Sequence, residues 1–298
     1  MKIQRWFSLL AVAILVGCSA KDETDGADSF MGKPVPIIIA LDNNVASLTR
    51  ATTLPTGTTA WLTGGANGMK AYTYDAGEVS TNDPLLWTSN AMTIYGYYVD
   101  NGTTTVTSAT PSYTVDDSHT SFLAGVATAN YSQAERESVS LTLRQQLAYL
   151  YIQISAVGNE EMGTPKLGND MLYTSGTFIN TTFDSNGYAI GGDGSGWTTS
   201  GSPTTIDMKQ LGSTNTYYAV LIPQKIGTSK PFLKITFDGF EVGFTLASET
   251  TFKAGCQYRM ALNSVTHTLY MSNFLIEDFA DADSSTSGSV PSSDVEIN

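Results

Sequence analysis

The residue types that most often carry enzymatic chemistry are scarce in this chain. It has two histidines, His119 and His267, and two cysteines, Cys18 and Cys256, all far apart in sequence. Their spacing matches neither the CxxC pairs nor the HExxH helix of zinc sites. No GxSxG elbow, Walker loop or strand-linked GxGxxG occurs either. The sequence therefore predicts a protein that is not an enzyme and that needs no metal and no cofactor.

Carboxylate pairs and a glycine-rich run support the same prediction. Asp116-Asp117 and Glu160-Glu161 are adjacent in sequence. Within a strand, the two side chains of such a pair point to opposite faces and cannot form an acid–base dyad. Residues 191–196 are rich in glycine but lack the Lys-Ser/Thr of a phosphate-binding loop. We interpret them as a turn.

Cys18 is the residue whose surroundings indicate a specific modification. Two basic residues precede an apolar run over residues 6–16, which is too short to span a bilayer as a helix. The run ends in Leu-Val-Gly-Cys, which resembles a bacterial lipobox, where the cysteine is acylated and becomes the mature N-terminus. We therefore predict a signal peptide over residues 1–17, lipidation of Cys18, and a lipidated tether over residues 18–35. Cys256 then has no disulfide partner and is expected to be a buried, inert thiol.

The composition indicates an all-β fold. Charged residues make up 14% of the 298 residues, and the formal net charge is −13. Thr, Ser, Asn and Gly fill the gap, a mixture that suits strands and turns rather than a helical bundle. Nucleic acid is excluded as a partner, because phosphates need a basic surface.

Short segments of β-type composition recur between turns from residue 36 to residue 279. In one of them, Val139, Leu141 and Leu143 alternate with polar residues, which is typical of a half-buried strand. Asp238-Gly239 separates two apolar runs and predicts a two-residue hairpin turn with two positive φ angles. About 240 ordered residues exceed one seven-stranded sandwich of ~100 residues, so we predict two tandem antiparallel β-sandwich domains.

A cluster of charges at residues 133–137 marks the predicted boundary between these domains. The N-terminal sandwich is expected over residues 36–137 and the C-terminal sandwich over 138–279. A polar tail follows over residues 280–298.

Five segments, in this order along the chain, resemble the fimbrillin family of Bacteroidales, whose members are lipoprotein-derived type V pilins of donor-strand type. The first joins an apolar strand at residues 37–41 to a Thr-Arg pair at Thr49-Arg50. In the second, at residues 139–152, the family usually has Phe-x-His-x-Leu where this chain has Leu-Arg-Gln-Gln-Leu. The other three are an apolar strand ending in Pro-Gln, a Phe-x-x-Gly-x-x-Tyr pattern and a final strand near Ile-x-x-Trp, at residues 217–224, 251–258 and 275–279.

The resemblance implies transthyretin-like sandwiches and a mechanism of assembly. Such a subunit is exported to the cell outer membrane as a surface-exposed lipoprotein, and an arginine-specific protease then cuts it. Here the cut is expected between Arg50 and Ala51, within a segment of small and polar residues, so that residues 36–50 are removed. A strand of another fimbrial subunit fills the groove that the first strand leaves, and the subunit joins a fimbrium with a role in adhesion.

The residues of the first strand agree with this mechanism. Ile37, Ile38, Ile39 and Leu41 are too apolar for a solvated linker, so we expect all four to be buried. Their loss would uncover apolar surface and unpaired strand edges, which an incoming strand satisfies. In the C-terminal tail, the apolar candidates for a donor strand are Val290, Val295 and Ile297.

The sequence is also compatible with two other functions. The polar tail also fits a tip or anchor subunit that does not polymerise, and in an anchor Arg50 stays uncut. A surface lipoprotein that binds glycans or host ligands is the other alternative, because Trp61, Trp87 and Trp197 lie in polar, Gly/Thr-rich surroundings where they could form stacking platforms.

Overall fold

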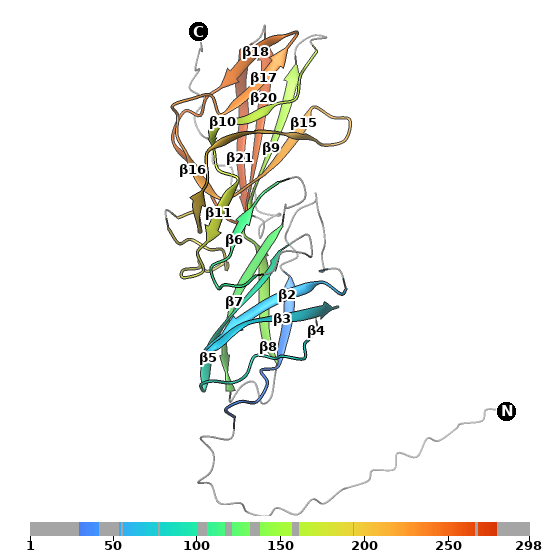
Figure 1. Ribbon diagram of the computed structural model, residues 1–298. Coiled ribbons are helices and arrows are strands. Elements are labelled where there is room, and N and C mark those ends of the chain that lie inside the picture. The colour runs from blue at the N-terminus through green and yellow to red at the C-terminus, as the bar shows by residue number, and fades with distance from the viewer. Residues whose placement is uncertain are drawn as a thin grey trace, which may run out of the picture.

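The structure, a computed structural model, describes residues 30–41, 54, 56–76, 78–99, 106–116, 121–131, 138–156, 161–192, 194–265 and 268–278. The elements in these ranges are strands, β1 to β21, which confirms the predicted all-β class. Within the same ranges, no helix is long and apolar enough to cross a bilayer. The molecule is elongated, with two halves arranged end to end (Figure 1).

The first half is a closed barrel with the strand order β1-β4-β3-β2-β5-β7-β8. Its ring closes where β1 lies between β8, to which it is parallel, and β4, to which it is antiparallel. The prediction of purely antiparallel sheets is therefore wrong at this seam. The barrel strands are β1 (Ile37–Leu41), β2 (Thr59–Gly64), β3 (Asn67–Asp75), β4 (Glu78–Ser80), β5 (Ala91–Val99), β7 (Phe122–Asn130) and β8 (Val139–Gln145).

The second half packs a five-stranded sheet, β14-β15-β9-β20-β21, and a four-stranded sheet, β13-β10-β17-β18, around one apolar core. In this half β9 and β20 are also parallel. A small β16-β19 sheet completes it. The strands are β9 (Ala148–Ala156), β10 (Lys166–Leu172), β13 (Thr204–Asp207), β14 (Lys209–Gln210), β15 (Thr216–Leu221), β16 (Gln224–Ile226), β17 (Leu233–Phe237), β18 (Phe240–Phe244), β19 (Thr250–Phe252), β20 (Cys256–Val265) and β21 (Thr268–Asp278).

The predicted hairpin turn is confirmed between β17 and β18. Phe237 pairs with Phe240, and the two residues between them, Asp238 and Gly239, have φ angles of 48° and 88°. The two positive φ angles match the right-handed twist of the flanking strands. Cys256 is buried as expected, with 5% of its surface exposed.

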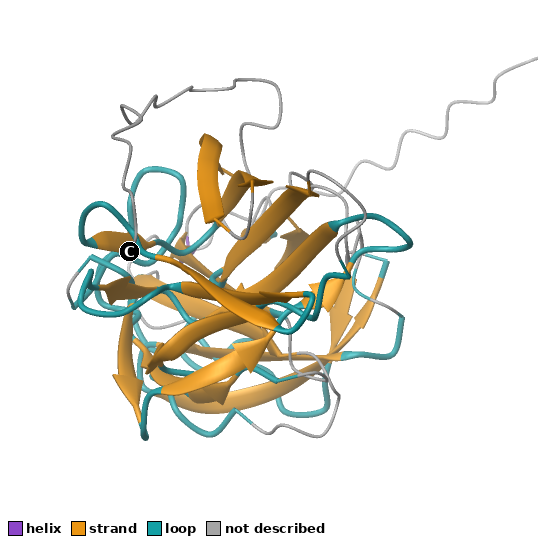
Figure 2. Cartoon of the chain, turned by 90° about the horizontal axis from the view of Figure 1, so that it is seen from above, coloured by secondary structure: helices purple, strands orange, loops and turns teal. Residues whose placement is uncertain are grey.

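The two halves share a sheet and a core at their junction. Strand β6 (Ser112–Thr114) follows the barrel strand β5, yet it pairs with β11 (Ser175–Phe178), whose other edge pairs with β12 (Trp197–Ser200). One apolar cluster joins side chains of both halves, among them Tyr97 and Phe122 from the barrel and Tyr149 and Trp197 from the second half. Seen along the long axis, the strands of the two halves overlap (Figure 2). Shared pairing and a shared core join the two halves into one rod.

The junction also bears on where one domain ends. Strand β8 belongs to the barrel and β9 to the five-stranded sheet. The chain therefore passes from one half to the other between Gln145 and Ala148. We propose the domain boundary there, and not after residue 137, because the charge cluster at residues 133–137 precedes a strand that still pairs within the barrel.

Strands β7 and β8 approach each other closely at Gly125. A Cβ atom added at Gly125 would overlap the carbonyl oxygen of Thr142 on β8, which is backbone and cannot swing aside. We expect Gly125→Ala to lower the free energy of unfolding by about 2 kcal/mol, in the range of overpacking substitutions. Gly68→Ala is the matched control, because nothing lies within 4 Å of its added Cβ. Urea denaturation of both variants checks this, and equal stability would contradict it.

Candidate functional site

Strand β1 is the candidate functional element, because it holds the barrel closed from an N-terminal position. Five consecutive residues pair with β8, from Ile37 opposite Val139 to Leu41 opposite Leu143. On its other edge only Ile38 pairs with β4, opposite Glu78. Just before the strand, the Val139 N–H donates to the Pro36 carbonyl at 2.8 Å. The strand is therefore firmly paired on one edge and weakly on the other.

The side chains of β1 alternate between the barrel core and solvent. Ile37 and Ile39 are buried, with 9% and 1% of their surfaces exposed, and Leu41 packs against the same core while half-buried. Ile38 is 44% exposed, so the prediction that all four apolar residues are buried is wrong at this position. The reason is the pleat, which turns every second side chain to the other face of a strand.

The residues before β1 are also fixed to the barrel. We call residues 30–36 the latch. Their backbone pairs with residues 85–87, since Val35 N–H donates to Leu85 and the Trp87 N–H donates to Lys33, each at 2.9 Å. The described structure thus includes residues 30–35 of the predicted tether over residues 18–35.

Aromatic contacts hold the latch at the end of the barrel. The Phe30 ring stacks on Tyr131 with centroids 4.6 Å apart, and Trp87 meets Tyr131 edge-on at 5.6 Å. Lys33 Nζ lies over the Tyr131 ring and donates to its hydroxyl at 3.1 Å. These contacts cover Trp87, which is only 2% exposed.

The predicted cleavage site lies between two residues that the structure fixes in the barrel. Leu41 ends β1, and Leu54 is buried in the same core cluster with 3% of its surface exposed. A cut after Arg50 would therefore separate the latch and β1 from the rest of the chain while Leu54 stays with the body. Arg50 and Ala51 themselves lie outside the described residues, as do Cys18, His119, His267 and the donor-strand candidates Val290, Val295 and Ile297.

Two of the three candidate tryptophans do not form the stacking platforms that a glycan site needs. Trp87 and Trp197 are each only 2% exposed, and Trp197 Nε1 donates to the Gln146 carbonyl at 2.8 Å inside the junction. Trp61 is half-buried against the junction core. Carbohydrate stacking needs an exposed ring face, so two of the three candidates fill the core instead.

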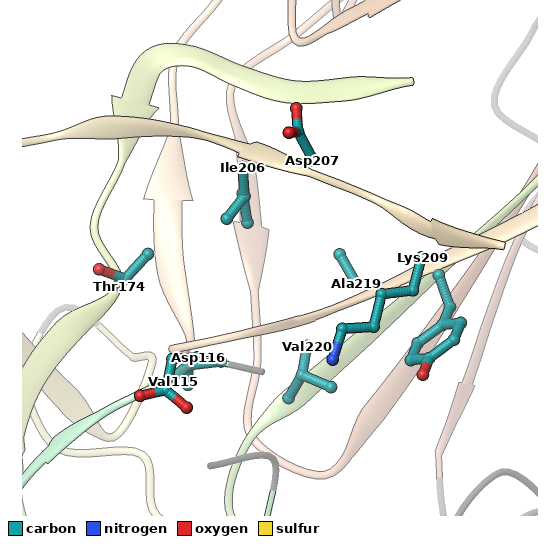
Figure 3. Close-up of a pocket in the computed structure, with 9 residues that line it drawn as sticks. Val115, Asp116, Thr174, Ile206, Asp207, Lys209, Ala219 and Val220 are labelled. Carbon is teal, nitrogen blue, oxygen red and sulfur yellow. The ribbon is translucent and has the colours of Figure 1, made fainter. Parts of the chain in front are cut away.

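Two cavities of different size lie near the junction. The smaller, of about 60 Å³, is lined by Asp116, Lys209, Tyr218 and neighbouring residues (Figure 3). This volume is far below the ~300 Å³ at which ligand pockets begin. A shallow groove of about 360 Å³ runs beside it along β6 and β11, but its single aromatic lining residue, Tyr113, is 4% exposed. The smaller cavity, although Tyr218 lines it, is too small for a sugar, and the groove offers no exposed ring face.

A metal centre is likewise unsupported by the described ranges. Across these residues, no three His, Cys, Asp or Glu side chains come together as a group that could hold a metal ion.

Tyr97 has a structural role at the junction. Burial raises the pKa of Tyr97 strongly, so its hydroxyl stays protonated. It accepts from Asn180 at 3.0 Å and donates to the Ala109 carbonyl at 2.7 Å, which is a structural role at the junction.

Sequence reasoning found β1 but missed the latch. The run of apolar residues at positions 37–41 was the local signal for this strand. No local signal pointed to the stacking of Phe30 on Tyr131, because the two residues are 101 positions apart in the sequence.

Comparison with known proteins identifies what this arrangement is similar to. The sequence model of a family described as fimbrillin-like matches residues 44–278. A search of curated proteins found no match. Among solved structures, a candidate cell adhesion protein from Bacteroides ovatus is 19% identical, with a TM-score of 0.57 over 83% of this chain and 98% of that one. A candidate cell adhesion protein from Bacteroides uniformis is 16% identical, with a TM-score of 0.56 over 87% of this chain and 100% of that one. The tip fimbrial protein Mfa3 from Porphyromonas gingivalis, with a C-terminal truncation, is 10% identical, with a TM-score of 0.47 over 83% and 100%.

Proposed function

Because the chain belongs to the fimbrillin-like family of structural fimbrial proteins, we propose that it is a fimbrial subunit assembled by protease-triggered strand exchange. The family membership itself indicates a non-enzymatic, cell-surface protein that assembles with other fimbrial subunits. The proposal adds export as an outer-membrane lipoprotein through Cys18, cleavage after Arg50, transthyretin-like domains and a role in adhesion.

The observation that carries the proposal is the position of β1 in the barrel. The strand is N-terminal, lies between two other strands, and is separated from the body by the predicted cut. Its removal leaves β8 without a partner on one edge and opens the core where Ile37 and Ile39 were. Burying an isoleucine side chain contributes about 1.5–3 kcal/mol. The open barrel therefore gains several kcal/mol from any apolar strand that takes the same place.

Two features of β1 define the strand that replaces it. The two core positions are spaced i and i+2, so the incoming strand needs apolar residues at alternate positions. Val295 and Ile297 have this spacing and are candidates for the tail of another copy. The position of Ile38, by contrast, faces solvent and accepts a polar residue.

Arg50→Ala on cells that make the full chain tests the proposal. We expect the wild-type surface protein to begin at Ala51 and to form fibres, whereas the variant keeps its lipidated N-terminus and stays monomeric. Mass spectrometry of the N-terminus and electron microscopy of surface material measure the two outcomes. Arg144→Lys serves as the control, because Arg144 lies within β8 and is not in the predicted cleavage segment.

Other results would contradict the proposal in distinct ways. Fibres built from uncut protein would reject the role of proteolysis. An intact N-terminus in wild-type protein at the base of a fibre would favour the anchor role. Fibres that form unchanged after deletion of residues 280–298 would reject the tail as donor.

A further inference from the structure

The end of the molecule opposite the barrel carries exposed apolar side chains. Phe240, Val265 and Tyr270 are 62%, 44% and 41% exposed, and we call them the far-end surface. Strand β9 starts at the junction, and β20 runs parallel to it, so the end of β20 at Val265 lies away from the barrel. Figure 1 shows the β17–β18 hairpin at this same end. Among the described residues, Phe240 and Tyr270 are the aromatic members of the exposed large apolar side chains.

The turn that presents Phe240 is held rigidly. The Asp238 N–H donates to the Glu161 carbonyl at 3.0 Å, and the Glu161 N–H donates to Asp238 Oδ1 at 2.8 Å. Met162 also forms a bridge with Phe237. An exposed aromatic ring on a pre-organised turn loses little entropy when it binds, which is typical of the anchor residue of an interface.

The latch covers a matching surface at the other end of the rod. Leu86, Trp87 and Tyr131 lie beside the start of β5 and the end of β7, and we call them the barrel-end site. Leu86 is 36% exposed, whereas Trp87 is closed over by the latch. Because residues 30–36 precede Arg50, a cut there that releases β1 also releases the latch. Tyr131 then loses the Phe30 ring, and Leu85 and Trp87 lose their backbone partners.

We propose that the far-end surface of one copy docks on the barrel-end site of the next copy after the latch has left. Release of the latch removes the Phe30 ring from Tyr131. The exposed ring of Phe240 can take its place, because both are phenyl rings. The two surfaces lie at opposite ends of the rod (Figure 1). Such a head-to-tail contact does not close on itself and builds a filament. The inference rests on the proposed function, to which it adds a second, side-chain contact beside strand exchange.

The latch prevents this contact from forming before cleavage. Before cleavage the barrel-end site is occupied by the chain's own residues, so the precursor is protected from joining other copies through it. Cleavage opens the groove of β1 and the barrel-end site in one step, and both then bind the same neighbouring copy.

A cysteine pair across the contact tests the proposal on cells that make the full chain. In the variant Leu86→Cys/Val265→Cys, which keeps the Phe240 ring, we expect mild oxidation to join copies into a ladder of disulfide-linked oligomers on a non-reducing gel. The control variant Ile190→Cys/Val265→Cys should give no ladder, because Ile190 is 41% exposed but lies in the loop between β11 and β12. A ladder of equal strength from both pairs would overturn the proposal.

Phe240→Ala measures how much this contact contributes to fibre assembly. We expect the yield of fibres to fall at least about tenfold, as for the loss of an interface anchor. Ile190→Ala should leave the yield unchanged. Wild-type fibres together with normal assembly of Phe240→Ala would overturn this inference alone and leave the proposed function intact. Failure of the wild-type protein to form fibres after cleavage at Arg50 would overturn the proposed function and this inference with it.

Discussion

Ile39→Ala should lower the free energy of unfolding of the uncut protein by about 3 kcal/mol. Ile39 is 1% exposed and lies opposite Leu141 at the seam of the barrel, so truncation leaves a cavity among the core side chains. Urea denaturation followed by tryptophan fluorescence measures the change, because Trp87 is buried in the same core cluster.

Ile38→Ala is the matched control for this prediction. It removes the same atoms from the neighbouring residue, which is 44% exposed, so it should cost less than about 1 kcal/mol. If β1 is released on processing, the two variants and the wild type should yield cleaved subunits of equal stability. A difference between Ile39→Ala and wild type that persists after the cut would show that β1 stays with the body.

Gln146→Leu should lower the free energy of unfolding by about 3 kcal/mol, because it leaves buried polar groups without partners. The Gln146 side chain is fully buried where the chain crosses from the barrel to the second half. Its Oε1 accepts from the Ala189 N–H at 2.9 Å, and its Nε2 donates to the carbonyls of Ala124 and Gly187, each at 3.2 Å. One side chain thus bonds to both halves of the rod.

Gln153→Leu is the control for the junction, since Gln153 is exposed on β9 and should tolerate the change within about 0.5 kcal/mol. Limited proteolysis adds a second measurement. We expect Gln146→Leu to be cut faster near residues 184–189, whose backbone the glutamine binds. Equal protection of the two variants would contradict a role for Gln146 in joining the halves.

Gln146 and its neighbour Gln145 show what a sequence pattern alone does not predict. Gln145 and Gln146 stand in the segment where the resembling family usually has a histidine, and the sequence alone assigned them no role. In the structure, Gln145 Oε1 accepts from the Phe122 N–H at 3.0 Å, and its Nε2 donates to Tyr149 at 3.0 Å. The groups that bond to these two amides lie 4 to 43 positions away in the sequence, so only the tertiary structure identifies them.

The sequence by itself determined the local structure. Alternation identified β8, an Asp-Gly pair identified the β17–β18 turn, and the low charge with abundant Thr and Gly identified an all-β fold. These features depend on the φ preferences and side-chain spacing of a few neighbouring residues, which a sequence records directly. The order of the segments along the chain also identified the fimbrillin-like family.

Only the tertiary structure decided which surfaces these elements cover. It closed the first half into a barrel through a parallel β1–β8 pair, placed Ile38 in solvent, buried Trp87 and Trp197, and put Phe30 on Tyr131. Each of these results depends on pairing between segments far apart in the chain. Such pairing depends on the apolar surface buried and the backbone hydrogen bonds formed over the whole fold. A short stretch of sequence therefore cannot predict it.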